Sequence, residues 1–421
     1  MTAARVSPSS TGLERDRLSW MLYLSVATYG YFLYGFGVSV PLLRDELQIS
    51  RSEAGLHGTA LACGSVVAGL WGARLIARFG RDAVLWTGSA MMCIGVVTYC
   101  TGQVAAVTLL GALIAGSGGA LLLNIVNAVM MDRHGFAGPA ALSEANAFGS
   151  GAGVVAPLVI GAVVAVGLGW RAGLLVSVLL VVVVRTVFRR ERLPAPLLPA
   201  APVTAFEGAD GTAAPHRRLP PAFWITWGVF ACVIAVEFCL ALWVSDELRV
   251  RDNLAAGPAS AGVAAVLVGL TVSRVAGGKL GLRHGVDWLL DRSIAVLLLG
   301  FAGFWLTASP WVALPSLLVC GLGLGMLAPL TIGRSVVAAG GRSDLAVART
   351  SLGAGLAIGA GPFLIGAIAD RTSVHAAFLL VPVLLVLALL GLAISRPLLA
   401  NGGRGRGGGG GREWVDGKAG G

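Results

Sequence analysis

The chain alternates between long apolar stretches and short polar segments. Twelve stretches are apolar on every side of a would-be helix, and each is near or above the roughly 18 residues needed to cross the hydrocarbon core of a bilayer. They cover residues 18–41, 54–76, 83–103, 105–130, 143–167, 171–188, 222–245, 258–278, 289–308, 311–333, 347–369 and 374–395. None alternates with the period of two that barrel strands require. The pattern predicts an all-α membrane protein with twelve transmembrane helices.

The polar segments divide this array into two halves. The longest, rich in Pro, Ala and Arg, separates six stretches from six. We therefore predict an N-terminal tail at 1–17, a six-helix bundle at 18–188, a linker at 189–221, a second bundle at 222–396 and a tail at 397–421. The Gly/Arg-rich final tail cannot bury a core and is expected to be disordered.

Basic residues are unevenly shared between the two sides of the predicted membrane. With the N-terminus inside, 24 of the 31 basic residues fall in inside segments and six in outside segments. Lys and Arg accumulate in cytoplasmic loops, so both termini are expected in the cytoplasm and the protein in the plasma (inner) membrane. The dominance of Arg, Ala and Gly is typical of a GC-rich bacterium. The net charge of +10 is spread over short clusters, so nucleic acid is not an expected partner.

The two halves repeat each other at an offset of 205 residues. The matching positions include Gly64 and Gly269, Gly116 and Gly321, Gly118 and Gly323, Pro157 and Pro362, and Gly161 and Gly366. A single gapless offset that aligns several helices predicts two pseudo-symmetric bundles. Repeated halves that hold a solute near the midplane are a common feature of transporters.

Composition and motifs argue against an enzyme. Hydrophobic residues make up 56% of the chain and charged residues only 12%, whereas soluble domains carry about 25% charged residues. All six cysteines lie in apolar stretches without metal-ligand spacing. There is no phosphate-binding loop and no Ser–His–Asp or zinc cluster in a plausible setting. We expect no cofactor and no metal.

Short motifs give the chain a family resemblance over about residues 18–396. The loop GARLIARFGRD resembles the Gly-x-Leu-Ala-Asp-Arg-x-Gly-Arg motif of the major facilitator superfamily. Ala77 replaces its Asp, so Asp82 or Asp132 would have to supply the carboxylate. The matching or displaced loop positions are Gly72, Leu75, Arg78, Gly80 and Arg81.

Two further stretches, GSGAGVVAPLVIG and GAGLAIGAGPFLIGAIAD, resemble glycine–proline motifs of the same family. The matching positions include Pro157, Gly161, Pro362, Gly366 and Asp370. The resemblance implies two six-helix bundles, alternating access, a monomer, and gating or structural roles for these residues.

Ionisable groups within the apolar stretches are the first candidates for a site. Glu237 sits about fifteen residues into the stretch at 222–245, where a charge costs about 3 kcal/mol on insertion scales. It is interpreted as a proton-coupling carboxylate, with a structural hydrogen bond as the alternative. Arg274 is a candidate for an anionic substrate or, preferably, for bracing a gate. Counting residues places the two at different depths.

Other polar residues are candidates for the same solute path. Asn124 and Asn127 share a helix face, as do Tyr31 and Tyr34. For the tyrosines aromatic packing is an equal alternative. Glu144 and Asn146 open the stretch at 143–167, although a carboxylate there is also favoured by the helix dipole.

These observations predict a secondary active transporter of a small organic solute, working by alternating access and powered by protons; the family resemblance favours efflux over uptake. One alternative is an uptake permease for a sugar or organic anion, with Arg274 as the anion contact. Another is a non-transporting receptor or sensor on the same fold.

Overall fold

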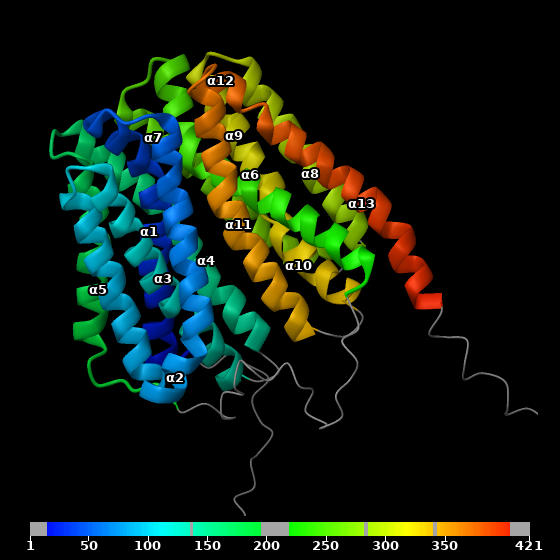
Figure 1. Cartoon of the computed structure of the whole chain (residues 1–421), viewed down its shortest axis with the longest axis horizontal. Helices are drawn as coiled ribbons and strands as arrows, with labels where there is room; N and C mark the ends of the chain where they lie inside the picture. The colour runs from blue at the N-terminus through cyan, green and yellow to red at the C-terminus, as the bar shows by residue number, and fades with distance from the viewer. Residues whose placement is uncertain (1–14, 135–137, 195–218, 282–284, 340–342, 405–421) are drawn as a thin grey trace, which may run out of the picture.

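The computed structural model describes residues 15–134, 138–194, 219–281, 285–339 and 343–404, and every regular element in these ranges is a helix (Figure 1). The helices are α1 (Arg17–Leu47), α2 (Arg51–Thr101), α3 (Ala105–His134), α4 (Gly138–Ala165), α5 (Trp170–Val187), α6 (Pro221–Arg251), α7 (Ala256–Gly281), α8 (Val286–Leu306), α9 (Pro310–Leu324), α10 (Leu327–Ala338), α11 (Ser343–Ala369), α12 (Val374–Ala377) and α13 (Leu380–Arg404).

Eleven helical spans in the described ranges are long and apolar enough to cross a membrane. The predicted twelve are approximately met, because α2 contains two predicted stretches. Its helical geometry breaks at Gly80, which has a φ of 81°. In two other places two helices together form one span, namely α9 with α10 and α12 with α13.

The break at Gly80 reverses the chain. The backbone of Leu61, before the break, and that of Met92, after it, contact Gly116 and Gly118, which are neighbours on α3. An unbroken helix would separate residues 61 and 92 by about 46 Å at 1.5 Å per residue. The segments 51–79 and 81–101 therefore lie side by side along α3. Only a residue without a Cβ adopts the positive φ of this turn at no steric cost.

The internal repeat is visible in the packing. A Cβ on Gly116 would overlap the carbonyl oxygen of Leu61, and one on Gly321 would overlap that of Val266. Both glycines and both partners are 205 residues apart. Helix backbones that approach this closely gain packing contacts that larger side chains would prevent. The same offset relates the contacts of Gly118 with Met92 and Gly88 to those of Gly323 with Leu297 and Ser293.

The two halves meet along two equivalent seams. In the first, Gly161 of α4 packs on Gly257 of α7; in the second, Gly366 of α11 packs on Arg51 and Ser52 of α2. The offset of 205 carries one contact onto the other. In Figure 1 the helices of the first half, coloured blue to teal, lie beside those of the second, coloured green to red. The chain is thus two related bundles joined by helix pairs.

Three helix ends lie near the predicted boundaries of the bundles. α5 ends at Val187 and α6 begins at Pro221, which leaves the linker between them. α13 continues to Arg404, past the predicted end at 396. Most of the predicted tails and linker, residues 1–14, 195–218 and 405–421, lies outside the described residues.

The repeated glycine contacts predict equal sensitivity in both halves. Gly116→Ala and Gly321→Ala should each lower stability by about 1–3 kcal/mol through overpacking. Gly151→Ala is the matched control, because nothing lies within 4 Å of a Cβ there, and it should be neutral or stabilising by up to about 1 kcal/mol. Thermal unfolding of the purified protein in detergent measures the difference. Wild-type stability in either close-packed variant would contradict the equivalence.

Candidate functional site

Glu237 lies at the centre of the interface between the halves. It is sixteen residues after the start of α6 and fourteen before its end, and only 7% of its surface is exposed. The hydroxyl of Tyr34, on α1 of the other half, donates a hydrogen bond to Glu237 Oε1 over 3.2 Å. A buried carboxylate is thus shared by both bundles.

Arg274 of α7 completes this central cluster. Its guanidinium lies 3.9 Å from Glu237 Oε1 and donates a 3.2 Å hydrogen bond to the hydroxyl of Ser150 on α4. The expectation that Glu237 and Arg274 lie at different depths is wrong. Arginine carries its charge at the end of a long flexible stem, so counting backbone positions misplaces its charged group. Glu237, Arg274 and Tyr34 form the central cluster.

From the central cluster, α1 and α6 run together toward one end of the molecule. Tyr34 contacts Glu237, Gly37 packs on the backbone of Ala241, and Arg44 pairs with Asp246. Residue numbers rise together along both helices, so the two helices run parallel. This α1–α6 seam extends from Glu237 to the ends of both helices.

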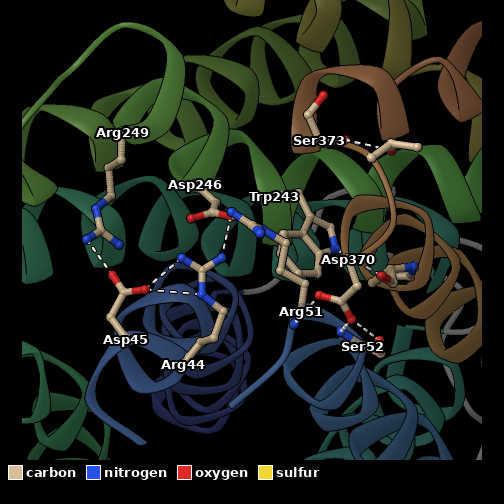
Figure 2. A network of polar contacts seen from close by, with 11 residues as sticks. Arg44, Asp45, Arg51, Ser52, Trp243, Asp246, Arg249, Asp370 and Ser373 are labelled. Atoms are coloured by element: carbon tan, nitrogen blue, oxygen red, sulfur yellow. Dashed lines mark hydrogen bonds and ion pairs between the residues drawn. The ribbon is translucent and has the colours of Figure 1, made fainter. Parts of the chain in front are cut away.

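A network of charges closes that end (Figure 2). Asp246 of α6 is fully buried, and its Oδ2 lies 2.5 Å from Arg44 of α1 and 3.5 Å from Arg51 of α2. Arg249 of α6 reaches back to Asp45 of α1 over 2.5 Å. All three of these pairs join one half to the other. Arg44 also pairs with its neighbour Asp45, within the first half. We call this end, where α12 lies in Figure 1, the closed end.

A carboxylate from the second half also caps a helix of the first. Asp370, which follows α11, accepts hydrogen bonds of 2.8 Å from the backbone amides of Arg51 and Ser52 and a further bond from the Ser52 hydroxyl. Partial burial acts to raise the pKa of Asp370, but the bonds from Ser52 and Arg51 and the charge of Arg51 outweigh it, so this pKa lies below its ordinary value. The negative charge also suits the helix N-terminus.

Beyond the central cluster, toward the end where α1 begins, no hydrogen bond or ion pair between described residues joins the two halves. The ion pairs at that end stay within one half, as in Arg81 with Asp132 and Arg396 with Asp291. The ties that the described residues make between the two bundles therefore lie at the closed end and the centre.

The other predicted site residues lie apart from the central cluster. The hydroxyl of Tyr31 bonds the carbonyl of Gly173 over 2.8 Å, which ties α1 to α5. Glu144 pairs with Arg15 over 2.8 Å, and the exposed Asn146 bonds Leu142 of its own helix. Among the described residues, no hydrogen bond joins the cluster to the exposed Asn124 or to the partly buried Asn127.

The motif residues have structural positions. Gly80 forms the turn described above, Arg78 is exposed over the ring of Phe79, and Gly72 is buried beside Leu121. Arg81 is buried and pairs with Asp132 over 2.5 Å. Of the two carboxylates considered as substitutes for the motif aspartate, Asp132 therefore binds the motif arginine, and Asp82 binds Arg192 instead.

The proline motifs lie on the seams between the halves. Pro157 is inside α4, one turn before Gly161, and Pro362 is inside α11, one turn before Gly366. The indole of Trp243 donates a 2.9 Å hydrogen bond to the carbonyl of Pro362.

The closed-end network was not predicted from the sequence. A signal existed, because the triplet Asp-Glu-Leu recurs at 45–47 and 246–248, at the ends of two repeated helices. In the described ranges no group of three or more His, Cys, Asp or Glu residues is placed to hold a metal ion.

Asp246 should hold the closed end together. Asp246→Asn leaves Arg44 and Arg51 without their shared carboxylate, and breaking such a buried pair costs about 3–5 kcal/mol. Spin labels at Leu168→Cys and Trp311→Cys, exposed positions at the closed end in opposite halves, should report longer and broader distances when the native cysteines are replaced. Asp252→Asn, with no partner in the other half among the described ion pairs, is the control. An unchanged distance distribution in Asp246→Asn would contradict this role.

Asp370 should make the closed end sensitive to acid. Since its pKa is lowered by the cap, its contribution is complete above the ordinary value of 3.8 and is lost as the pH falls through the lowered pKa. The same spin-label distance should therefore lengthen below about pH 4. Asp370→Asn should show a weaker closed end at pH 7 and lack this part of the acid response. An identical acid response in that variant would assign the effect to other groups.

Comparison with known proteins agrees with this architecture. A family model described as Major Facilitator Superfamily matches residues 22–339. No curated protein matches the sequence.

Solved transporter structures share the fold at low identity. A peptide transporter is 14% identical, with a TM-score of 0.72 over 91% of this chain and 95% of its own. The xylose transporter XylE from E. coli, partially occluded and inward open, is 14% identical with a TM-score of 0.69 over 89% and 95%. A bacterial homologue of the human lysosomal transporter Spinster, inward-facing and occupied, is 15% identical with a TM-score of 0.67 over 93% and 98%.

The family match covers well over half of the chain, and the solved structures share its helical architecture. Members of this family are multi-pass membrane transporters rather than enzymes. The chain belongs to the Major Facilitator Superfamily.

Proposed function

We propose that this protein is a proton-coupled secondary transporter that moves a small organic solute by alternating access and works as a monomer. One observation carries the proposal: the buried carboxylate of Glu237 is bonded by Tyr34 of the other half and lies 3.9 Å from Arg274. A charge at this depth is normally retained for a partner or a proton. Glu237 has a hydrogen-bond donor, Tyr34, and a cation, Arg274, as partners. It lies at the interface between the halves, which alternating access must rearrange.

The charge of Glu237 sets the strength of the central cluster. When ionised, it accepts the Tyr34 hydrogen bond and attracts Arg274 with a gross Coulomb energy of about 4 kcal/mol at an effective dielectric of 20. When protonated, it loses the attraction to Arg274 and becomes a weaker acceptor. The α1–α6 seam continues from Glu237 to Arg44 and Asp246 at the closed end. Protonation of Glu237 therefore weakens this seam at its central end.

The distribution of basic residues suggests how the protein is oriented in the membrane. The end where α1 begins carries most of the arginines, so we place it in the cytoplasm of a bacterial plasma membrane. The closed end then faces outward, and the described conformation receives its solute from inside. For this arrangement we propose efflux of the solute in exchange for protons.

Arg274 supports an anionic group on the solute. Its two hydrogen bonds, to Ser150 and to the carbonyl of Gly325, are long at 3.2 and 3.4 Å. A guanidinium with five donors held this loosely suits a carboxylate or phosphate. Uptake of an organic anion through the same site is the second proposal that this contact favours.

Replacing Glu237 with Gln tests the coupling. In proteoliposomes offered drugs, sugars and organic acids, the wild type should move protons with one solute class. Glu237→Gln should lose that proton movement by at least about tenfold, the effect of removing about 1.4 kcal/mol of coupling. It should still exchange labelled for unlabelled solute across the membrane, since exchange needs no net proton transfer. Glu144→Gln, at a surface ion pair, should behave as wild type.

Other outcomes would reject parts of the proposal. Unchanged pH-driven transport in Glu237→Gln contradicts the coupling role of this residue. Solute binding without flux, in protein of confirmed folding and orientation, would instead support a receptor built on the same fold. Loss of binding only in Arg274→Ala would favour the anion contact.

A further inference from the structure

Arginines at the two ends of the molecule differ in how they are paired with carboxylates. At the closed end Arg44, Arg171 and Arg249 each have a carboxylate within 2.6 Å. At the opposite end, several exposed arginines have no carboxylate within 4.0 Å among the residues that the structure describes. Besides Arg189, Arg190 and Arg349, these are Arg74, Arg78, Arg185 and Arg292. The last four share a further feature.

Each of these four guanidiniums lies over an aromatic ring. Arg185, at the end of α5, lies 4.8 Å from the ring centre of Trp86 on α2 and so bridges two helices. Arg292 lies 5.5 Å from Trp288, one turn earlier on α8. The other two stack over Trp71 and Phe79 at 5.3 Å. Stacking orients the flat guanidinium and leaves its edge free to donate hydrogen bonds.

The surroundings of these pairs are apolar and exposed. On α5, Leu179, Val182 and Val183 have 45–60% of their surface exposed. On α8, Leu299 is 71% exposed. Both helices are membrane-spanning by length and hydropathy, so these side chains face acyl chains. Arg185 and Arg292 lie near the ends of these helices, at the level where headgroups begin.

We propose that this end of the protein binds anionic phospholipids, with the phosphate held by Arg185 beside Trp86 in one half and by Arg292 beside Trp288 in the other. Trp86 lies on the segment 81–101, which the offset of 205 relates to α8. The two tryptophans therefore lie on corresponding helices of the two halves. A phosphate receives charged hydrogen bonds from the guanidinium edge, and the acyl chains cover the apolar side chains alongside.

The apolar surroundings favour a lipid over a soluble polyanion. Because the neighbouring leucines and valines face acyl chains, the phosphates nearest to these arginines are those of the lipid headgroups. The proposal concerns binding at the membrane surface and does not depend on the identity of the solute or on proton coupling.

Native mass spectrometry of the full-length protein tests the proposal. The protein is mixed with phosphatidylglycerol or with phosphatidylcholine of the same acyl chains, and the lipids retained per molecule are counted. The wild type should retain phosphatidylglycerol in preference. Affinity should fall about fivefold for each arginine removed in Arg185→Gln and Arg292→Gln, because each contributes about that much near an anionic surface. Arg192→Gln is the matched control, since Arg192 is exposed at the same end but paired with Asp82.

Three results would overturn the proposal. Equal retention of both lipids would remove the charge preference, and wild-type retention in the double variant Arg185→Gln/Arg292→Gln would remove the sites. Displacement of phosphatidylglycerol by inorganic phosphate at constant ionic strength would assign the arginines to a soluble anion. Thermal unfolding of the variants at wild-type temperature confirms that any loss of lipid is not a loss of folding.

Discussion

The structure depends on one constraint: a charge buried between helices in a membrane must have a partner. Glu237 and Asp246 are both buried on α6, and both find partners in the other half of the chain. Removing one member of such a pair costs several kcal/mol, so each pair is a strong local tie. Because the ties cross the interface between the bundles, they also determine which end of the molecule is closed.

The two seams between the halves are equivalent in position but different in chemistry. Between α4 and α7 the contact is made by Gly161, Gly257 and Ser260, whose small size allows close approach. Between α2 and α11 the same close contact is reinforced by Asp370 and by the bond from Thr59 to the carbonyl of Gly359. The seam of α4 with α7 also holds the bond from Arg274 to Ser150. Of these two seams, the one of α2 with α11 carries the carboxylate among the described contacts, so it is the one that a proton can act on directly.

Much of the architecture could be predicted from the sequence, because lipid imposes long apolar helices and the repeat imposes their pairing. The 205-residue offset matched Gly116 with Gly321, and the two glycines make equivalent contacts in the structure. Glu237 was identified because a carboxylate within an apolar stretch is costly. Helix periodicity could not place the charged end of Arg274, nor reveal that Tyr34 and Tyr31, three residues apart, contact different helices. The pairs of Asp246 and Asp370 join positions up to about 320 residues apart in the chain, and local patterns carry no information on such contacts.

The central claim is that the two ends of the protein open in turn, under control of the charge on Glu237. Spin-label distances measured at both ends of the same protein test it most directly. One pair is placed at Leu168 and Trp311 at the closed end, and the other at Val187 and Val337, exposed positions at the opposite end. At one fixed pH above the range in which Asp370 titrates, Glu237→Gln, which carries no charge at this position, should lengthen one distance and shorten the other relative to the wild type. Distances that change independently, or wild-type distances at both ends in Glu237→Gln, would contradict it.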